Sequence, residues 1–472
     1  MVKMRMKRCV TSSAKINVRN DIYSAIKPLF YISKIIGLAP FSYNENHKFG
    51  FQISRIGTLY SLFLCVLLTF LFGKVLIWRI RTLFLNQKFI VGFVVICDSC
   101  LFAISIIVSY FLSATFNKNK LLKFLRLVSN VDLCINVSKI SYKRILILVT
   151  STIILVIVFY VMLFTVYYLY VKPYAPSFRG NIIYFLFSFL GEFMAIHFTY
   201  SVLLLKHRFD RVNNCLLAAF DVDERTLDEL QSEIVATSCT CKSMPETISG
   251  NLKEHIGGTV VESRMNSDDT PKIITRNVST KINDTCTNNE KYDLNFRIKT
   301  LRTMHSILCE AVQLTNSMYQ IQNLINLMEI FLKVILFLFA GLSFLSRYIT
   351  CGHNPWGWKI LSWLALITCM KVFRLVTVIW VCQGVRNAAG RTGNLVHKLL
   401  VIKDLHKDNI KELFLFSKQV LDRPIQFSTC GFFLLDFAVV NSMAGAVTTY
   451  LIILLQHGTQ SIDEFVEICN SA

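Results

Sequence analysis

The sequence predicts an all-α membrane protein with seven transmembrane helices and an intracellular N-terminus. Hydrophobic residues make up 53% of the 472 residues, and charged residues make up only 17%, against roughly 25% in an average soluble domain. Seven windows are apolar over the roughly 20 residues that a helix needs to cross a bilayer. Lysine and arginine are abundant in every second segment between these windows, which is the pattern that sets orientation in a membrane.

The seven windows follow one another with two long interruptions. Residues 1–55 are polar and basic, and they lack the apolar centre of a signal peptide. Residues 206–326 separate the fourth window from the fifth, and residues 383–430 separate the sixth from the seventh. The expected spans are Ile56–Ile77, Phe89–Thr115, Ile145–Val171, Asn181–Leu205, Leu327–Ser346, Ile360–Cys382 and Gly431–Gln456.

The spans therefore divide into three groups. Residues 56–205 carry the first four, residues 327–382 the next two, and residues 431–456 the last. We expect residues 457–472 to form an extracellular tail, because they contain no lysine or arginine.

The basic residues set the expected orientation. The first 55 residues contain ten, the second loop seven and the sixth loop eight, whereas the third and fifth loops contain two each. Basic segments stay on the cytoplasmic side, where anionic lipid lies. We therefore expect the N-terminus and the even-numbered loops inside and the C-terminus outside.

The long loop 206–326 is expected to be helical at both ends and disordered in its middle. Residues 237–293 are rich in polar residues and poor in aromatics, which predicts disorder. The run before the fifth span carries an apolar stripe at helical spacing, from Leu301 to Ile325. Residues from Phe209 to Phe220 suggest a similar extension of the fourth span, and 383–430 carries a further stripe. Such cytoplasmic extensions form an anchor, either by packing on each other or by packing on another subunit.

Several ionisable residues fall inside the spans, where each charge is costly. Asp98, Glu192, Lys371 and Arg374 are the main examples. Glu192 pairing with Lys371 or Arg374 would be a structural role, and a water-filled ligand pocket would be a functional one. Glu329 and Lys333, four residues apart, are expected to pair along one helix face.

Aromatic residues near the outer end of the third span leave two interpretations open. Tyr160 and Tyr167 belong to a group of four tyrosines there. An interfacial belt is the favoured interpretation. The alternative is the wall of a ligand pocket.

The last span combines small residues with a polar stripe. Thr449, Ile453, Gln456 and His457 lie on one face of a helix. A glutamine at the outer end of that face fits a narrow, water-lined passage, and it also fits a span that simply ends at the headgroups.

This last span resembles the insect gustatory receptor family. The mark of the family is Thr-Tyr, five apolar residues, Gln and then Phe. Here Thr449 and Tyr450 are followed by residues 451–455 and Gln456, and His457 replaces the phenylalanine.

Other stretches carry the same resemblance. They are Cys430–Phe433, Asp436 and the run His305–Cys309, and the last of these is more similar to broadly tuned and bitter-type members than to sugar-type members. The resemblance extends to the seven-span plan of the whole chain.

The resemblance implies a ligand-gated, non-selective cation channel in the plasma membrane of sensory neurons. It implies a homo- or heterotetramer around a central pore, with a small-molecule tastant bound among spans two to six and permeant cations and membrane lipids as partners. Thr449, Tyr450, Ile453, Gln456 and His457 would form the pore and gate. Asp98, Tyr160, Tyr167, Glu192, Lys371 and Arg374 are weak pocket candidates.

Other classes fit less well. The sequence has no phosphate-binding loop, dinucleotide fingerprint, metal-ligand spacing or nucleophile elbow, so we expect no enzyme, cofactor or metal. The net charge of +20 is explained by the loops rather than by nucleic acid. A G-protein-coupled chemoreceptor would need the opposite orientation, and a transporter would show inverted repeats and broken helices.

Overall fold

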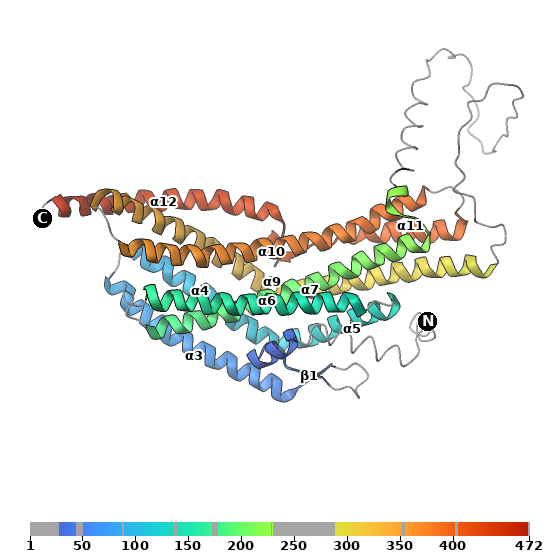
Figure 1. The fold of residues 1–472 in the computed structure, drawn as a ribbon, viewed down its shortest axis with the longest axis horizontal. Helices are drawn as coiled ribbons and strands as arrows, with labels where there is room; N and C mark the ends of the chain where they lie inside the picture. The colour runs from blue at the N-terminus through green and yellow to red at the C-terminus, as the bar shows by residue number, and fades with distance from the viewer. Residues whose placement is uncertain are drawn as a thin grey trace, which may run out of the picture.

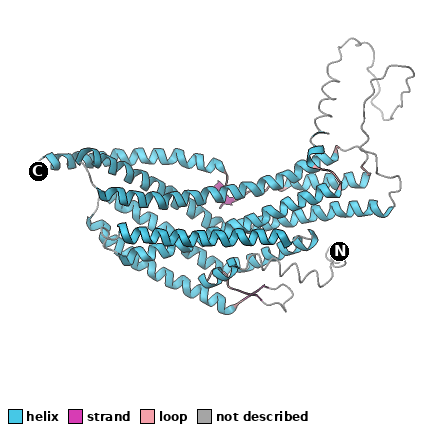
Figure 2. Ribbon diagram, viewed as in Figure 1, coloured by secondary structure: helices cyan, strands magenta, loops and turns pink. Residues whose placement is uncertain are grey.

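The fold is a bundle of long helices that run nearly parallel along the longest axis of the molecule (Figure 1). The computed structural model describes residues 28–43, 51–86, 89–135, 139–171, 178–227, 229, 288–351, 355–401 and 405–470. Helices account for almost all of the described chain, with two small two-stranded sheets (Figure 2).

The elements follow one another in the expected order. The helices are α3 (Arg55–Asn86), α4 (Phe89–Leu112), α5 (Lys118–Ile135), α6 (Lys139–Val166), α7 (Phe178–Ala219), α9 (Asn288–Cys351), α10 (Pro355–Leu400), α11 (Lys407–Asp422) and α12 (Phe437–Asn470). Two π-helical turns, η2 (Ser113–Asn117) and η3 (Tyr167–Val171), join α4 to α5 and end α6. The strands are β1 (Phe41–Tyr43), β2 (Phe51–Ile53), β3 (Ser428–Thr429) and β4 (Phe433–Leu434), paired antiparallel as β1–β2 and β3–β4.

Seven helices are long and apolar enough to cross a membrane, which confirms the seven predicted spans. Three of them are much longer than a membrane requires. At 1.5 Å per residue, the 64-residue α9 extends about 96 Å and the 46-residue α10 about 69 Å. Because the hydrocarbon core is only about 30 Å thick, large parts of α7, α9 and α10 lie beyond it.

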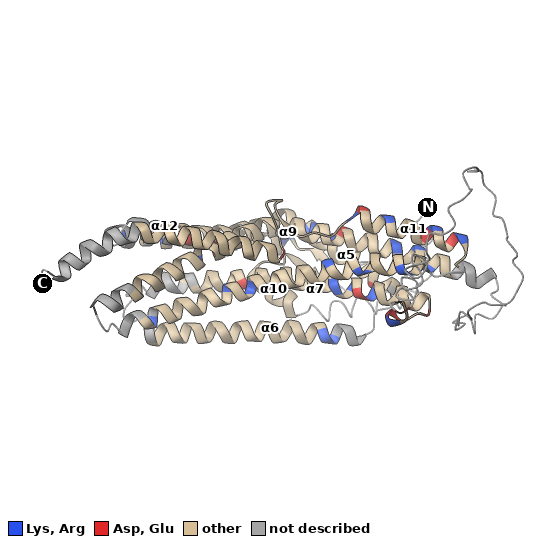
Figure 3. Cartoon of the chain, turned by 90° about the horizontal axis from the view of Figure 1, so that it is seen from above, with Lys and Arg blue, Asp and Glu red and all other residues tan. Residues whose placement is uncertain are grey.

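Charge divides the bundle into two halves. Figure 3 shows blue and red residues gathered at the end that contains α5 and α11, while the end that contains the C-terminus is almost uncoloured. We call the charged half the distal bundle: α5, α11, the end of α7, the first half of α9 and the end of α10. The other half is poor in charged residues, as expected of the membrane-spanning part.

The distal bundle has its own hydrophobic core within a single chain. The predicted stripes face one another there: Phe209 and Leu216 of α7, Leu308 of α9, and Leu399 and Leu413 are all fully buried. The stripes therefore pack on each other, which was one of the two open interpretations. Most of the predicted disordered stretch, 237–293, lies outside the described residues, but its last part is helical because α9 begins at Asn288.

A buried ion pair fixes α5 to α7 inside the distal bundle. Arg208 donates hydrogen bonds to both carboxylate oxygens of Asp132, at 3.0 and 2.8 Å, and both side chains are at most 3% exposed. Such bidentate geometry satisfies two donors at once and sets the relative rotation of the two helices.

The N-terminal segment is part of the bundle, which the basic composition of residues 1–55 did not predict. Residues 28–36 form a helix that ends at Gly37, whose φ of +84° favours glycine. Leu38 N donates to the carbonyl of Ser33 at 2.8 Å, which closes the helix end. A Cβ on Gly37 would also lie 2.5 Å from a methyl carbon of Leu64, so the backbone conformation favours glycine and any larger residue would have to displace the end of the Leu64 side chain.

The last helix begins later than predicted. The expected span started at Gly431, but β3 and β4 form a tight hairpin there and α12 starts at Phe437. Three residues, 430–432, join the two strands, and two of them, Cys430 and Gly431, have positive φ. Asp436 then caps the helix, because its carboxylate accepts a hydrogen bond from Ala438 N at 3.1 Å. At its other end α12 continues to Asn470, through most of the predicted tail 457–472.

Candidate functional site

The predicted intramembrane charges meet in one buried network among α4, α7, α9 and α10. Its members are three acids and three bases: Asp98, Glu192, Glu329, Lys333, Lys371 and Arg374. All six are buried, with exposures of 9% or less. Because the apolar faces of the helices point at lipid and at each other, these side chains have only the centre of the bundle in which to lie.

One end of the network is a tight pair between α4 and α9. Lys333 donates to both oxygens of Asp98, at 3.0 and 2.8 Å. Its ammonium also lies 3.6 Å from Glu329, one turn earlier on the same helix. The predicted pairing of Glu329 with Lys333 is therefore present, but Asp98 is the nearer partner.

The other end joins α7 to α10. Arg374 donates to Glu192 at 3.0 Å, and Lys371 lies 3.5 Å from the same carboxylate. Glu192 was expected to pair with Lys371 or Arg374, and in the structure it lies close to both. Lys371 and Arg374 also approach Glu329, at 3.5 and 3.8 Å, so Glu329 sits between three cations.

Glu329 is the least tightly bound member. Its nearest cations are all 3.5 Å or farther away, and neither of its buried carboxylate oxygens has a hydrogen-bond partner within the described chain. The Lys371 ammonium is in the same situation. Buried charged groups without hydrogen-bond partners are costly, so a rearrangement that supplied such partners would stabilise Glu329 and Lys371.

The network is electrically neutral as a whole, since three negative charges face three positive ones. The ring of Phe102 also lies under two of the cations, with Lys371 Nζ 4.9 Å and Lys333 Nζ 5.7 Å from its centroid. Neutrality makes the network tolerable inside a bundle, where a single unpaired charge would cost several kcal/mol.

Of the two candidate tyrosines, Tyr167 is buried in the bundle and Tyr160 is partly buried. Tyr167 is 1% exposed and packs on Phe185 and Trp363. The hydroxyl of Tyr160 shares a hydrogen bond with Ser188 Oγ at 2.8 Å. Tyr168, next to Tyr167 in the chain, is by contrast 46% exposed.

The pore candidates lie on the surface of the single chain. Thr449, Tyr450, Ile453 and Gln456 are all exposed on α12, and the ring of Tyr450 also contacts Phe331 of α9. His457 lies within α12, but its side chain falls outside the described residues. The structure therefore places the pore candidates together on α12, and Tyr450 meets α9 at Phe331, between Glu329 and Lys333 in the sequence.

Sequence reasoning missed two features near the network. The ion pair between Lys333 and Asp98 was not expected, although both residues are charged and lie within predicted spans. His197, one turn and a half beyond Glu192 on α7, forms a hydrogen bond with Ser33 of the N-terminal helix. Among the described residues, no cluster of three or more His, Cys, Asp or Glu side chains could hold a metal ion.

Comparisons with known proteins agree on the family. The sequence profile described as 7tm Chemosensory receptor matches residues 26–460. The Drosophila melanogaster gustatory receptor for bitter taste 66a is 28% identical over 185 residues, which span 37% of this chain and about a third (33%) of that receptor. The Drosophila gustatory receptor for sugar taste 43a is 23% identical over 456 residues, or 91% of this chain and 96% of that receptor.

A solved structure has the same fold. The insect olfactory receptor OR5 from Machilis hrabei matches with a TM-score of 0.52 at 13% identity, covering 91% of this chain and 97% of that receptor. Identity at this level supports the fold alone. With the family profile covering most of the chain, and with seven membrane-length helices in this arrangement, the protein belongs to the 7tm chemosensory receptor family.

Proposed function

We propose that the protein is a gustatory receptor that acts as a ligand-gated, non-selective cation channel in the plasma membrane of chemosensory neurons. The N-terminus and the distal bundle lie in the cytoplasm, and the C-terminal end of α12 lies outside. A small-molecule tastant opens the channel, and the ligand class is bitter or otherwise non-sugar.

The exposed face of α12 is the observation that carries the channel proposal. Only 11% of its span is buried within the chain, the smallest share of the seven candidate spans, against 72% for α7. The exposed face of α6 is mainly apolar, as lipid requires, with Ile154 at 56% and Val158 at 61% exposed. On α12, by contrast, Asn441 and Gln456 are exposed at membrane depth.

A polar stripe on a spanning helix favours water or a second subunit over lipid. Ser442, Gly445, Thr449, Ile453 and Gln456 recur at three- and four-residue spacing, so they share one face of α12, and all five are exposed. Val439 and Val447, on the opposite side, are buried toward the rest of the chain. Four copies arranged around a fourfold axis, as a homo- or heterotetramer, would turn this stripe inward and line a narrow pore.

The charge network supports a ligand pocket in the same chain. Asp98, Glu192, Lys371 and Arg374 come from three helices that would rearrange if a polar ligand entered among them. Tyr160 and Tyr167 supply aromatic faces on the side of α6. A ligand that competes for these contacts would favour one arrangement of the helices over another. Gating requires such a shift between two arrangements.

Cysteine accessibility tests the channel proposal. Thr449→Cys would be expressed in cells that lack G-protein signalling, and quinine and denatonium would be applied beside sucrose and fructose. A membrane-impermeant, positively charged methanethiosulfonate should block the evoked current of Thr449→Cys, because the new thiol faces the water-lined path. Ile154→Cys, exposed on α6 and facing lipid, is the matched control and should conduct as the unsubstituted protein does after the same treatment.

Three outcomes would contradict the proposal in different ways. Equal block of both variants, or current without block of Thr449→Cys, would remove α12 from the pore. A response that appears only when G-protein signalling is restored would favour a coupled receptor. Current evoked by the sugars and not by the alkaloids would overturn the ligand class while leaving the channel in place.

A further inference from the structure

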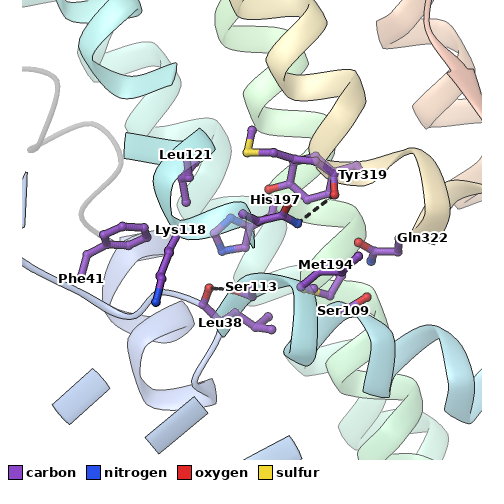
Figure 4. A pocket seen from close by; sticks show the side chains of 13 residues that line it. Leu38, Phe41, Ser109, Ser113, Lys118, Leu121, Met194, His197, Tyr319 and Gln322 are labelled. Carbon is purple, nitrogen blue, oxygen red and sulfur yellow. Dashed lines mark hydrogen bonds between the residues drawn. The ribbon is translucent and has the colours of Figure 1, made fainter. Parts of the chain in front are cut away.

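A cavity inside the bundle is too small for a ligand of lipid size. It lies between the N-terminal segment, the α4–η2–α5 elbow, α7 and α9, and Leu38, Lys118, His197 and Gln322 are among its lining residues (Figure 4). Its volume is about 30 Å³, which is enough for about two water molecules. A lipid that binds this protein therefore binds at the outer surface of the helices.

The outer face of α10 ends in an exposed tryptophan. Phe373, Val376 and Trp380 are 66%, 39% and 59% exposed and recur at three- and four-residue spacing, whereas Gln383 follows on the next turn. Trp380 lies about 38 Å along the helix from Pro355, the first residue of α10. Because a bilayer with its headgroups is about 40–45 Å thick, Trp380 lies at the level of the headgroups, where tryptophan is enriched.

The outer face of α6 changes from apolar to basic near one end. Ile147 and Leu148 are 67% and 46% exposed, and Lys143 and Arg144, one turn earlier, are also exposed. Figure 3 shows blue residues at this end of α6. Neither basic side chain forms an ion pair with a described residue. This end of α6 therefore presents positive charge beside an apolar face.

The register between α6 and α7 places Lys206 at the same level. The hydroxyl pairs Tyr160–Ser188 and Thr152–Tyr200, at 2.8 and 2.7 Å, show that the two helices run in opposite directions. Lys206 lies six residues beyond Tyr200 on α7, so it is level with the residues about six positions before Thr152 to ten before it on α6. These positions include the basic end of α6.

Lys206 lies against α10 at the level of the exposed tryptophan. Its ammonium is 5.4 Å from the centroid of the Trp380 ring, a cation–π contact. Its stem passes over Gly384, where a Cβ would lie 3.2 Å from Lys206 Cδ. The Lys206 ammonium forms no ion pair with a described residue, although Asp210 follows one turn later on α7. The described chain thus supplies no counter-ion for this cation.

This surface faces away from the proposed pore helix. Arg386 of α10 lies 4.0 Å from Asp436, the residue that precedes α12. Arg386 follows Gly384 by two residues, so the two positions are about 160° apart around the helix. The surface formed by Arg144, Lys206 and Trp380 is therefore on the side of α10 opposite to its contact with the start of α12.

We propose that Arg144, Lys206 and Trp380 form a binding site for an anionic phospholipid of the cytoplasmic leaflet. The lipid phosphate is held by the Lys206 ammonium, with the Arg144 guanidinium at the same level as a second cation. The Trp380 ring lies at the ester region, and an acyl chain runs along Phe373 and Val376. The assignment to the cytoplasmic leaflet rests on the proposed orientation of the channel, whereas the chemistry of the site does not.

Native mass spectrometry of the full-length protein tests this site without any current measurement. The protein, purified in detergent, would be incubated with an equimolar mixture of phosphatidylserine and phosphatidylcholine, and the ratio of retained adducts would be measured. We expect phosphatidylserine to be preferred. Lys206→Gln should lower that ratio about fivefold, the factor equivalent to about 1 kcal/mol for one basic side chain near an anionic lipid. Arg144→Gln should lower it by a similar factor.

Lys118→Gln is the matched control, because it removes the same charge from α5, a helix that bonds α9 through Lys120. The Lys118 ammonium also forms no ion pair with a described residue. This variant should leave the ratio unchanged. Trp380→Leu should weaken the adducts of both lipids while keeping the preference. Unchanged size-exclusion elution of each variant would show that the fold is intact.

Four results would overturn the proposal. The first is no preference for phosphatidylserine in the unsubstituted protein. The second is an equal loss of preference in Lys206→Gln and Lys118→Gln, which would indicate general surface charge. The third is complete displacement of the lipid by excess inorganic phosphate, which would assign the site to a soluble anion. The fourth is a changed number of subunits in the spectra of Lys206→Gln, which would assign the surface to a contact between copies of the chain. Because no arm depends on gating, failure here and failure of the channel proposal are distinguishable.

Discussion

Replacing Lys333 by methionine tests whether the buried charges hold one another in place. Methionine has a similar length and no charge, so the substitution keeps most of the packing. It removes both hydrogen bonds to Asp98, at 3.0 and 2.8 Å, and the cation 3.6 Å from Glu329. The network then contains three acids and two bases and carries a net negative charge.

The expected cost follows from burial. Breaking a buried ion pair by removing one partner costs about 3–5 kcal/mol, because the remaining charge stays desolvated. The Asp98 side chain is only 9% exposed, and Glu329 loses one of its three cations at the same time, so we expect a value toward the upper end. The double variant Lys333→Met with Asp98→Asn restores neutrality, and it should recover most of this loss.

The assay is chemical denaturation of the purified protein in detergent, followed by tryptophan fluorescence. Lys299→Met, at an exposed position on α9, is the control and should change the free energy of unfolding by less than about 0.5 kcal/mol. The reasoning would be refuted if Lys333→Met cost less than about 1 kcal/mol. It would also be refuted if the double variant were no more stable than the single one, since neutrality would then not be what stabilises the network.

Two further predictions concern a helix end and the pore. Gly37→Ala should lower the free energy of unfolding by more than Gly431→Ala does. Both glycines have positive φ, which costs an L-residue about 1–2 kcal/mol. Only at Gly37 does the new Cβ also lie within 2.5 Å of a neighbouring atom. Equal losses in the same denaturation assay would show that the close contact relaxes freely. If α12 lines a tetrameric pore, the evoked cation current should fall as the pH is lowered through the range where imidazole gains a proton. Four positive charges would then surround the ion path and repel cations. The variant His457→Phe should abolish this pH dependence. An unchanged pH profile in patch-clamp recordings of His457→Phe would contradict that role.

The local patterns were largely readable from the sequence. Runs of about 20 apolar residues predicted all seven spans, because the cost of burying polar groups in lipid leaves few alternatives. The stripes at three- and four-residue spacing predicted which faces of α7, α9 and α10 are buried, because a helix places such residues on one side. The pairing of Glu329 with Lys333 was predictable for the same reason.

Short interruptions were harder to predict. The start of α12 was misplaced by six residues, because the hairpin at Ser428–Leu434 is as apolar as the helix that follows it. Hydropathy registers composition, whereas the hairpin depends on two consecutive residues with positive φ. Asp436 gave the missing signal, since aspartate is a preferred residue at the start of a helix.

Composition and periodicity thus determined the number of membrane-length helices, several of their buried faces and the presence of costly charges within them. Tertiary structure decided which charges meet: Asp98 and Lys333 are 235 residues apart in the chain, and Glu192 and Arg374 are 182 apart. It also decided that the N-terminal helix docks into the bundle to form the wall of the cavity beside Lys118. The physical reason is that helical periodicity fixes the direction of a side chain relative to its own helix, whereas its partners depend on the rotation and depth at which separate helices pack.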